Sequence, residues 1–232
     1  MGQGLDLRLR STPVATIRVL VVDDHVVFSD ALATILGTEP EIEVVGKGGT
    51  VQEAISSARA LQPDVVLLDI HMPDGSGIEA VAAVKKDRPQ TQVVILTSDE
   101  DESVLRSAVQ AGVTGYLSKH ESAAQVVQAV RSAARGEALI APYMLARLLH
   151  GLQKKDEPGP ATPLTKRELE VLRELSLGHD NDAVATALRM SPNTVRTHVQ
   201  NILSKLKVHS KLEAVSRGIR EGWIRIPQEP AA

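Results

Sequence analysis

The first half of the chain alternates between two patterns of apolar residues. Short runs rich in Val, Ile and Leu are each followed by a segment in which apolar residues recur every three to four positions. Continuous apolar runs bounded by turn residues predict buried strands, and the three-to-four spacing predicts amphipathic helices. Strands are expected at 17–22, 43–47, 65–69, 92–96 and 114–118. Helices are expected at 26–37, 51–61, 77–87, 101–111 and 121–135.

This alternation of strands and helices predicts an α/β fold. Repeated strand–helix units form a parallel sheet with helices on both faces, joined by right-handed crossovers. We therefore expect a flavodoxin-like, doubly wound, five-stranded parallel sheet with strand order 2-1-3-4-5. In that order a ligand binds where strands 1 and 3 diverge.

The last third of the chain contains only helical patterns. Thr165 and Glu168 form a capping box that starts a helix reaching about residue 177. Asp180 is placed to cap a second helix, and Ser191-Pro192 starts a third that runs to about 207. A fourth helix is expected at 210–221. The pattern of helix, short turn and helix predicts a small all-α, four-helix helix-turn-helix domain, whose recognition helix enters the major groove.

Charge and composition divide the chain at the same place. Residues 17–137 carry 10 Lys+Arg against 18 Asp+Glu, a net charge of -8, whereas residues 163–232 carry 11 against 8, a net of +3. An acidic half joined to a basic half suggests two domains with different functions. The expected divisions are a polar leader at 1–16, the α/β domain at 17–137, a proline-broken linker at 138–162, the helical domain at 163–226 and a tail at 227–232.

The composition also predicts where the protein resides. No run of about 18 apolar residues is present, so we expect no membrane span. The leader lacks a continuous apolar segment, which argues against a signal peptide. The chain has no cysteine, which excludes disulfides and thiolate metal sites and fits a cytoplasmic protein.

Acidic side chains gather at one edge of the predicted sheet. Asp23-Asp24 ends the first strand and Asp69 ends the third. Neighbouring parallel strands would bring these carboxylates together at the carboxyl edge, where a hard cation such as Mg2+ balances their charge. Thr97 and Lys119 end the fourth and fifth strands at the same edge. A metal, a hydroxyl donor and a fixed ammonium are what a phosphoryl group requires.

The third helix of the basic half has the pattern of a nucleic-acid reader. The thirty residues from Ala183 to Leu212 contain no Asp or Glu. Val195, Val199, Ile202 and Leu206 form its expected buried stripe, while amide and guanidinium side chains face elsewhere. Such groups can hydrogen-bond base edges.

The first half resembles the receiver domain of bacterial two-component response regulators. The matching motifs are Asp23-Asp24, Leu-Leu-Asp69-Ile-His-Met-Pro, Ile-Leu-Thr97-Ser and Gly-Tyr116-Leu-Ser-Lys119. The resemblance implies that Asp69 accepts a phosphoryl group from a sensor histidine kinase. It implies Mg2+ ligands at Asp23, Asp24, Asp69 and the backbone carbonyl of His71. It also implies that Lys119 and Thr97 contact the phosphoryl group and that Tyr116 is the switch residue.

The second half resembles the LuxR-type helix-turn-helix, which together with the receiver indicates the NarL/FixJ class. The motifs begin at Leu164-Thr-Lys-Arg-Glu168 and continue through Ser191-Pro-Asn-Thr-Val to Leu206. The resemblance implies a homodimer on double-stranded promoter DNA with an inverted repeat, pairing through Leu212, Val215 and Ile219. The residues it implies for base contact are Arg196, Thr197 and Gln200, and those for backbone contact are Thr194, Asn201 and Lys205.

The leading interpretation is therefore a phosphorylation-activated transcription regulator. It is not an enzyme in the usual sense, although its receiver would support its own Mg2+-dependent phosphoryl transfer and autodephosphorylation. An aspartyl-phosphate hydrolase or mutase is one alternative, but it needs a second acid two residues after the nucleophile, where His71 stands. Another alternative is a DNA binder or adaptor that never takes up phosphate. Intact Asp23, Asp24, Asp69, Thr97 and Lys119 argue against that alternative.

Overall fold

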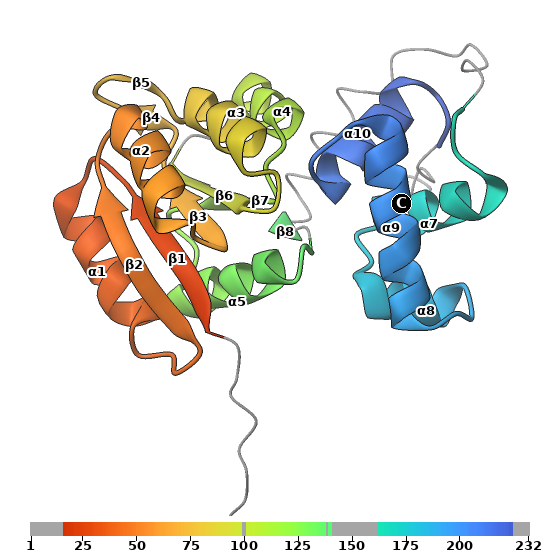
Figure 1. The fold of residues 1–232 in the computed structure, drawn as a ribbon, viewed down its shortest axis with the longest axis horizontal. Coiled ribbons are helices and arrows are strands. Elements are labelled where there is room, and N and C mark those ends of the chain that lie inside the picture. The colour runs from red at the N-terminus through yellow and green to blue at the C-terminus, as the bar shows by residue number, and fades with distance from the viewer. Residues whose placement is uncertain (1–15, 99–100, 138, 141–161, 225–232) are drawn as a thin grey trace, which may run out of the picture.

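The computed structural model describes residues 16–98, 101–137, 139–140 and 162–224 (Figure 1). Nearly all of the expected leader, most of the linker and the tail lie outside these residues. The sequence also allows a helix at 143–149, which lies outside them as well. Within the described residues, no helix is both long and apolar enough to cross a membrane.

The five predicted strands are confirmed and form one parallel sheet. The strand order is β2-β1-β3-β6-β7-β8, which is the expected order with one short strand added at the β7 edge. Buried aliphatic residues fill β3 and most of β1 and β6, as the continuous apolar runs predicted. The five expected strands are β1 (Ile17–Val22), β2 (Ile42–Gly48), β3 (Val65–Leu68), β6 (Gln92–Thr97) and β7 (Gly115–Ser118).

Helices cover both faces of this sheet (Figure 1). Leu20 and Val22 point into a core cluster shared with α2, α3 and α4, while Val19 and Val21 point into a second cluster shared with α1 and α5. This alternation along one strand is what a sheet buried on both faces requires. The helices are α1 (Val26–Leu36), α2 (Val51–Leu61), α3 (Gly77–Asp87), α4 (Glu102–Ala111) and α5 (Ala123–Ala134).

Three short strands were not expected from the sequence. β4 (His71–Met72) and β5 (Gly75–Ser76) form an antiparallel hairpin in the turn that follows Asp69. β8 (Leu139–Ile140) pairs in parallel with β7, although these residues fall in the segment that we predicted as linker. The sheet therefore extends past residue 137.

The C-terminal domain contains the four expected helices: α7 (Lys166–Ser176), α8 (Asn181–Ala187), α9 (Pro192–Leu206) and α10 (Lys211–Arg220). The capping box of Thr165 and Glu168 is present, Asp180 caps α8, and Ser191 caps α9 with Pro192 at its first position. These caps satisfy the backbone N–H groups that each helix start leaves unpaired. The stripe of α9 predicted to be buried packs into the core of this domain.

The two domains touch through α10, which lies against α4. Leu212 is buried in the receiver cluster that also contains Leu105 and Ala108 of α4. Val215 and Ile219 pack instead into the core of the C-terminal domain. These two residues therefore do not form the exposed dimer face that the resemblance implied, and Leu212 is covered by the receiver in this conformation.

Candidate phosphoacceptor site and nucleic-acid interface

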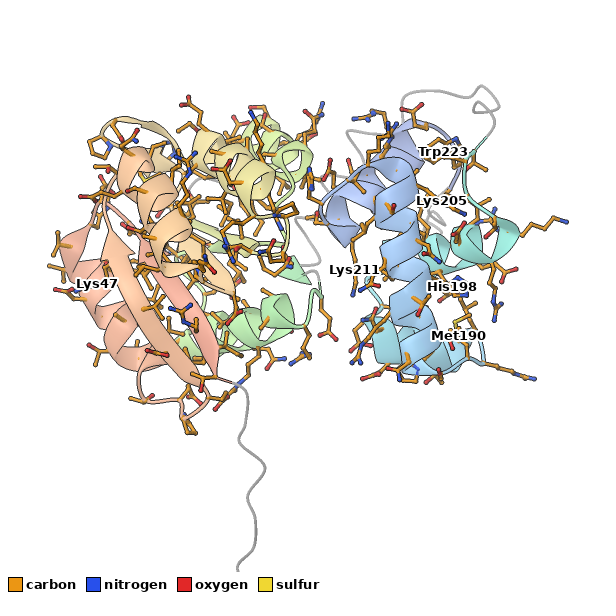
Figure 2. All side chains as sticks on the ribbon, viewed as in Figure 1. Lys47, Met190, His198, Lys205, Lys211 and Trp223 are labelled. Atoms are coloured by element: carbon orange, nitrogen blue, oxygen red, sulfur yellow. The ribbon has the colours of Figure 1, made fainter. Side chains whose placement is uncertain are left out.

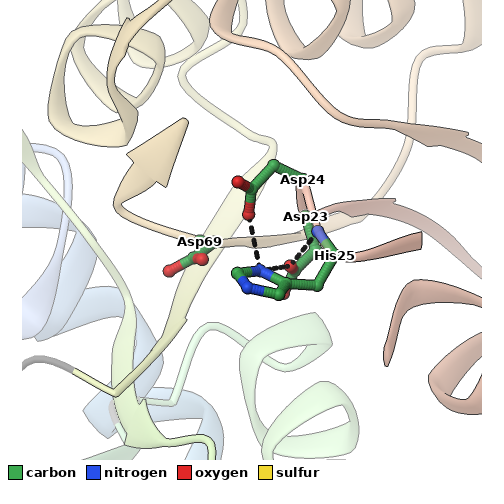
Figure 3. A group of neighbouring side chains, drawn as sticks. All are labelled: Asp23, Asp24, His25 and Asp69. Carbon is green, nitrogen blue, oxygen red and sulfur yellow. Dashed lines mark hydrogen bonds and ion pairs between the residues drawn. The ribbon is translucent and has the colours of Figure 1, made fainter. Parts of the chain in front are cut away.

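The predicted acidic cluster is present at the carboxyl edge of the receiver sheet. Asp23 directly follows β1 and Asp69 directly follows β3, and each is only 4% exposed. Asp24 lies further out, with 35% of its side chain exposed. Ligand atoms of Asp23, Asp24, His25 and Asp69 all lie within 4.8 Å of one another (Figure 3). Two adjoining parallel strands thus bring these carboxylates together, as the sequence predicted.

The backbone around Asp69 is held by short-range contacts. Its N–H donates to the carbonyl of Val22 at 2.9 Å, and its Oδ1 accepts a hydrogen bond from the N–H of Ile70 at 2.7 Å. The start of α3 packs so closely that a Cβ on Gly77 would lie 2.1 Å from the Asp69 carbonyl oxygen. Glycine is therefore required at position 77 because no other residue fits there.

Lys119 connects the two buried carboxylates. Its Nζ lies 2.7 Å from Asp23 Oδ2 and 2.7 Å from Asp69 Oδ2, and 12% of its side chain is exposed. Burial alone lowers the pKa of Lys119, but the hydrogen bonds to Asp23 and Asp69 outweigh burial and raise the pKa above its ordinary value. Lys119 is consequently a fixed positive charge at the point where Asp69 would gain a phosphoryl group.

Thr97 and Tyr116 take up the positions expected from their strands. Thr97 is the last residue of β6 and is fully buried beside the end of β7, where it pairs in register with Ser118. Tyr116 is fully buried in the core cluster that includes α4. His71 lies in β4, two residues after Asp69 in the chain, and is exposed. The structure thus brings Thr97 to the same edge as Asp69 and places Tyr116 two residues before the end of the neighbouring strand β7.

His25 belongs to the cluster but was not singled out from the sequence. Its Nδ1 lies 2.7 Å from Asp24 Oδ1 and 3.3 Å from Asp23 Oδ1, and its backbone N–H donates to Asp23 Oδ1 at 2.9 Å. Figure 3 shows the imidazole of His25 linked by dashed lines to the carboxylates of Asp23 and Asp24. An imidazole immediately after a pair of acids at a strand end was the sequence signal that could have found it.

The donor set suits Mg2+. This ion prefers carboxylate and carbonyl oxygens, usually one or two carboxylates together with water. Asp23, Asp24 and Asp69 supply such oxygens within the 4.8 Å cluster. Lys119 pairs with Asp23 and Asp69 through one oxygen of each, so other carboxylate oxygens of the cluster are left for a metal ion.

The exposed face of α9 carries all the side chains that the sequence assigned to DNA. The buried stripe faces the domain core, and the six candidate residues are all exposed on the remaining surface. Lys205 lies near one end of α9, while Met190 lies just before its other end (Figure 2). The six are Thr194, Arg196, Thr197, Gln200, Asn201 and Lys205.

Two contacts orient side chains on this face. Lys205 Nζ donates to Glu168 Oε2 at 2.7 Å, which ties the C-terminal turn of α9 to the capping box of α7. Arg196 Nη1 lies 3.3 Å from Asn193 Oδ1. Burial alone raises the pKa of Glu168, but the Lys205 contact and the Thr165 hydrogen bonds outweigh it and lower the pKa below its ordinary value. These contacts partly preorganise the side chains of Lys205 and Arg196.

Comparison with known families assigns both halves. Residues 19–131 match the model for the response regulator receiver domain, and residues 162–217 match that for bacterial regulatory proteins of the luxR family. A receiver joined to such a DNA-binding domain defines a transcription regulator of a two-component system. The chain belongs to this family of response regulators.

Individual relatives support this assignment over most of the chain. The response regulator protein VraR of Staphylococcus aureus is 40% identical over 210 residues, covering 90% of this chain and 100% of the relative. The crystal structure of ChrA, a response regulator of a heme-sensing two-component system, is 32% identical with a TM-score of 0.50 and covers 90% of this chain and 100% of that one. The NarL receiver domain from Mycobacterium tuberculosis is 31% identical with a TM-score of 0.51, covering 53% of this chain and 98% of that one.

Proposed function

We propose that Asp69 accepts a phosphoryl group from the phosphohistidine of a sensor histidine kinase. The observation that carries this proposal is the pairing of Lys119 with both Asp23 and Asp69 at 2.7 Å. This pairing places the acceptor carboxylate of Asp69, the carboxylate of Asp23 and the fixed charge of Lys119 at one edge of the sheet. Asp23, Asp24, Asp69 and the backbone carbonyl of His71 would hold Mg2+, which when bound neutralises charge on the phosphoryl oxygens.

The transfer uses few groups of this chain. An oxygen of Asp69 attacks phosphorus, the phosphorus–nitrogen bond to the kinase imidazole breaks, and that imidazole departs with the bonding electron pair. Lys119 exchanges its contact with Asp69 Oδ2 for a phosphoryl oxygen, and the hydroxyl of Thr97 donates to another. The Lys119 and Thr97 contacts stabilise negative charge that develops on the phosphoryl oxygens in the transition state, and this lowers the barrier to transfer. Water attack on the same phosphorus would account for autodephosphorylation.

The output is a change in how the domains contact each other. Phosphorylation replaces the single negative charge of the Asp69 carboxylate with the roughly 1.5–2 negative charges of a phosphoryl group. We infer that movement of Thr97 and Tyr116 toward the site alters the α4 surface on which Leu212 rests. Leu212 and Tyr116 lie in one cluster, which supports this route. Separation of α10 from α4 would then expose α10 and allow the protein to form a homodimer.

DNA binding is proposed for the exposed face of α9. Arg196, Thr197 and Gln200 would contact base edges, and Thr194, Asn201 and Lys205 would contact the backbone of double-stranded promoter DNA. A two-fold dimer would recognise an inverted repeat, because half-site symmetry mirrors protein symmetry. A receiver domain that starts at 17 and extends past 137 to include β8, a helical domain at 163–226 and a cytoplasmic location are part of the same proposal.

Acetyl phosphate with Mg2+ tests the first step. Intact-mass spectrometry is expected to show one added phosphoryl group on wild type and none on Asp69→Asn. Asp64→Asn is a matched control, since Asp64 precedes the same strand at its opposite end. An unmodified wild type would favour the alternative in which the receiver folds but takes up no phosphate.

A further inference from the structure

An aromatic ring borders the phosphoacceptor site. Lys119 Nζ lies 4.9 Å from the ring centroid of Phe28, which belongs to the first turn of α1. Phe28 is half-buried and packs against the core cluster shared by α1 and α5. A cation within about 6 Å of a ring centroid is attracted by the negative face of the ring. Phe28 is also the single phenylalanine in the chain.

The ring adds a third attractive neighbour to the ammonium. An ammonium group has three N–H donors, and Asp23 Oδ2 and Asp69 Oδ2 each lie 2.7 Å from Nζ. The Phe28 ring contacts the same ammonium without supplying a hydrogen-bond acceptor of fixed direction. It therefore restrains the position of Nζ while leaving its N–H groups able to rotate toward a new oxygen.

We propose that Phe28 is a positioning residue for phosphoryl transfer and acts through Lys119. The inference rests on the proposed phosphorylation of Asp69. When Lys119 exchanges Asp69 Oδ2 for a phosphoryl oxygen, the cation–π contact keeps the ammonium at the sheet edge throughout. An aliphatic side chain at position 28 would fill the space but would not attract the charge. A carboxylate there would compete with the phosphoryl group for Lys119.

Phosphorylation rates separate this role from simple packing. Phe28→Leu is expected to slow phosphorylation by acetyl phosphate about three- to tenfold, and Phe28→Tyr is expected to retain most of the wild-type rate because it keeps a π face. Val44→Ala is the matched control, since Val44 packs against the same cluster from β2. Equal rates for wild type and Phe28→Leu would overturn the proposal, as would equal losses in the Leu and Tyr variants.

The single phenylalanine permits a graded test. Growth of a phenylalanine auxotroph on fluorinated phenylalanines would alter position 28 alone. Fluorine withdraws electron density from the ring face with little change in shape, so the rate should fall stepwise from phenylalanine through 4-fluoro- to 3,5-difluorophenylalanine. A rate independent of fluorine number would assign Phe28 to packing only.

A double-mutant cycle measures the contact without phosphorylation. Phe28→Leu, Lys119→Met and the double variant are compared with wild type by denaturant unfolding. Non-additivity equivalent to about a threefold change or more in the unfolding equilibrium constant is expected. If wild type and Asp69→Asn both remain unphosphorylated, the proposed function fails and the positioning role fails with it. If wild type is phosphorylated but the cycle is additive, only the inference about Phe28 fails.

Discussion

Lys85 is a buried cation whose removal should stabilise the protein in a pH-dependent way. It lies in α3, is 1% exposed, and its Nζ is 3.5 Å from Gln92 Oε1. Burial lowers the pKa of Lys85 from 10.5 to about 8, and the carboxylate of Glu213 on α10 opposes only part of this shift. Burial likewise raises the pKa of Glu213, despite its hydrogen bond from His209. Both groups lie where the two domains meet.

The magnitude follows from the difference between the folded and unfolded pKa values. Between about pH 8 and pH 10.5 the unfolded chain binds more protons at Lys85 than the folded one, so the free energy of unfolding rises with pH in this window. At about pH 7 the lowered pKa corresponds to a cost of about 3 kcal/mol. By about pH 9.5 roughly 2 kcal/mol of that cost should have disappeared.

Lys85→Met tests this reasoning, because methionine nearly matches lysine in length and carries no charge. We expect the variant to be more stable than wild type at about pH 7, with an advantage that shrinks by roughly 2 kcal/mol at about pH 9.5. Denaturant unfolding of both proteins, followed by circular dichroism, measures the difference in their free energies of unfolding. The pH dependence of the titratable groups that the two proteins share largely cancels in this difference. Lys86→Met is the control, since Lys86 is the exposed neighbour in the same helix. The same difference at both pH values would refute the reasoning.

Three further predictions concern the loop after Asp69 and the recognition helix. Gly77→Ala would bring a Cβ to 2.1 Å from the Asp69 carbonyl oxygen, so we expect a loss of stability of about 3 kcal/mol or more in thermal unfolding, whereas Ser76→Ala should cost less. Hydrogen bonds from the Val51 and Gln52 N–H groups lower the pKa of Asp74. The ionised Asp74 therefore contributes to the free energy of unfolding above pH 3.8, and this contribution is lost as the pH falls. Asp74→Asn should make the free energy of unfolding depend less on pH in the acid range. Arg196→Ala should weaken specific DNA binding by roughly 1–3 kcal/mol in a titration. Arg173→Ala, which changes an exposed residue of α7 and none of α9, should bind normally.

Local sequence signals predicted most of the fold. In the part of the chain that the structure describes, the apolar runs and helix caps predicted the five main strands and nine helices close to their observed limits, because both signals depend on neighbouring residues. The acidic edge was also predictable, since parallel strands end on the same side of a sheet. β8 was missed because a two-residue strand is too short to carry a periodic pattern.

Contacts between distant segments were not predictable in this way. Lys85 precedes Lys86 in an amphipathic helix and resembles a solvated surface lysine, yet it is buried, with Gln92 of β6 and Glu213 of α10 nearby. The Phe28–Lys119 contact joins residues at opposite ends of the receiver sequence. Val215 and Ile219 were assigned to a dimer face by resemblance, whereas the packing of α7 and α9 places them in the domain core.

The receiver cluster provides a short physical route between the phosphoacceptor edge and the DNA-binding domain. Tyr116 on β7, Leu105 on α4 and Leu212 on α10 belong to one continuous set of buried residues. Burying a leucine contributes about 1.5–3 kcal/mol, so the Leu212 contact alone can bias domain docking strongly. A shift of about 5.5 kcal/mol moves a two-state equilibrium from 1:99 to 99:1. Burial disfavours the charged forms of both Lys85 and Glu213 near this contact, and under the proposed function phosphorylation at Asp69 would have to supply a shift of that order to release α10.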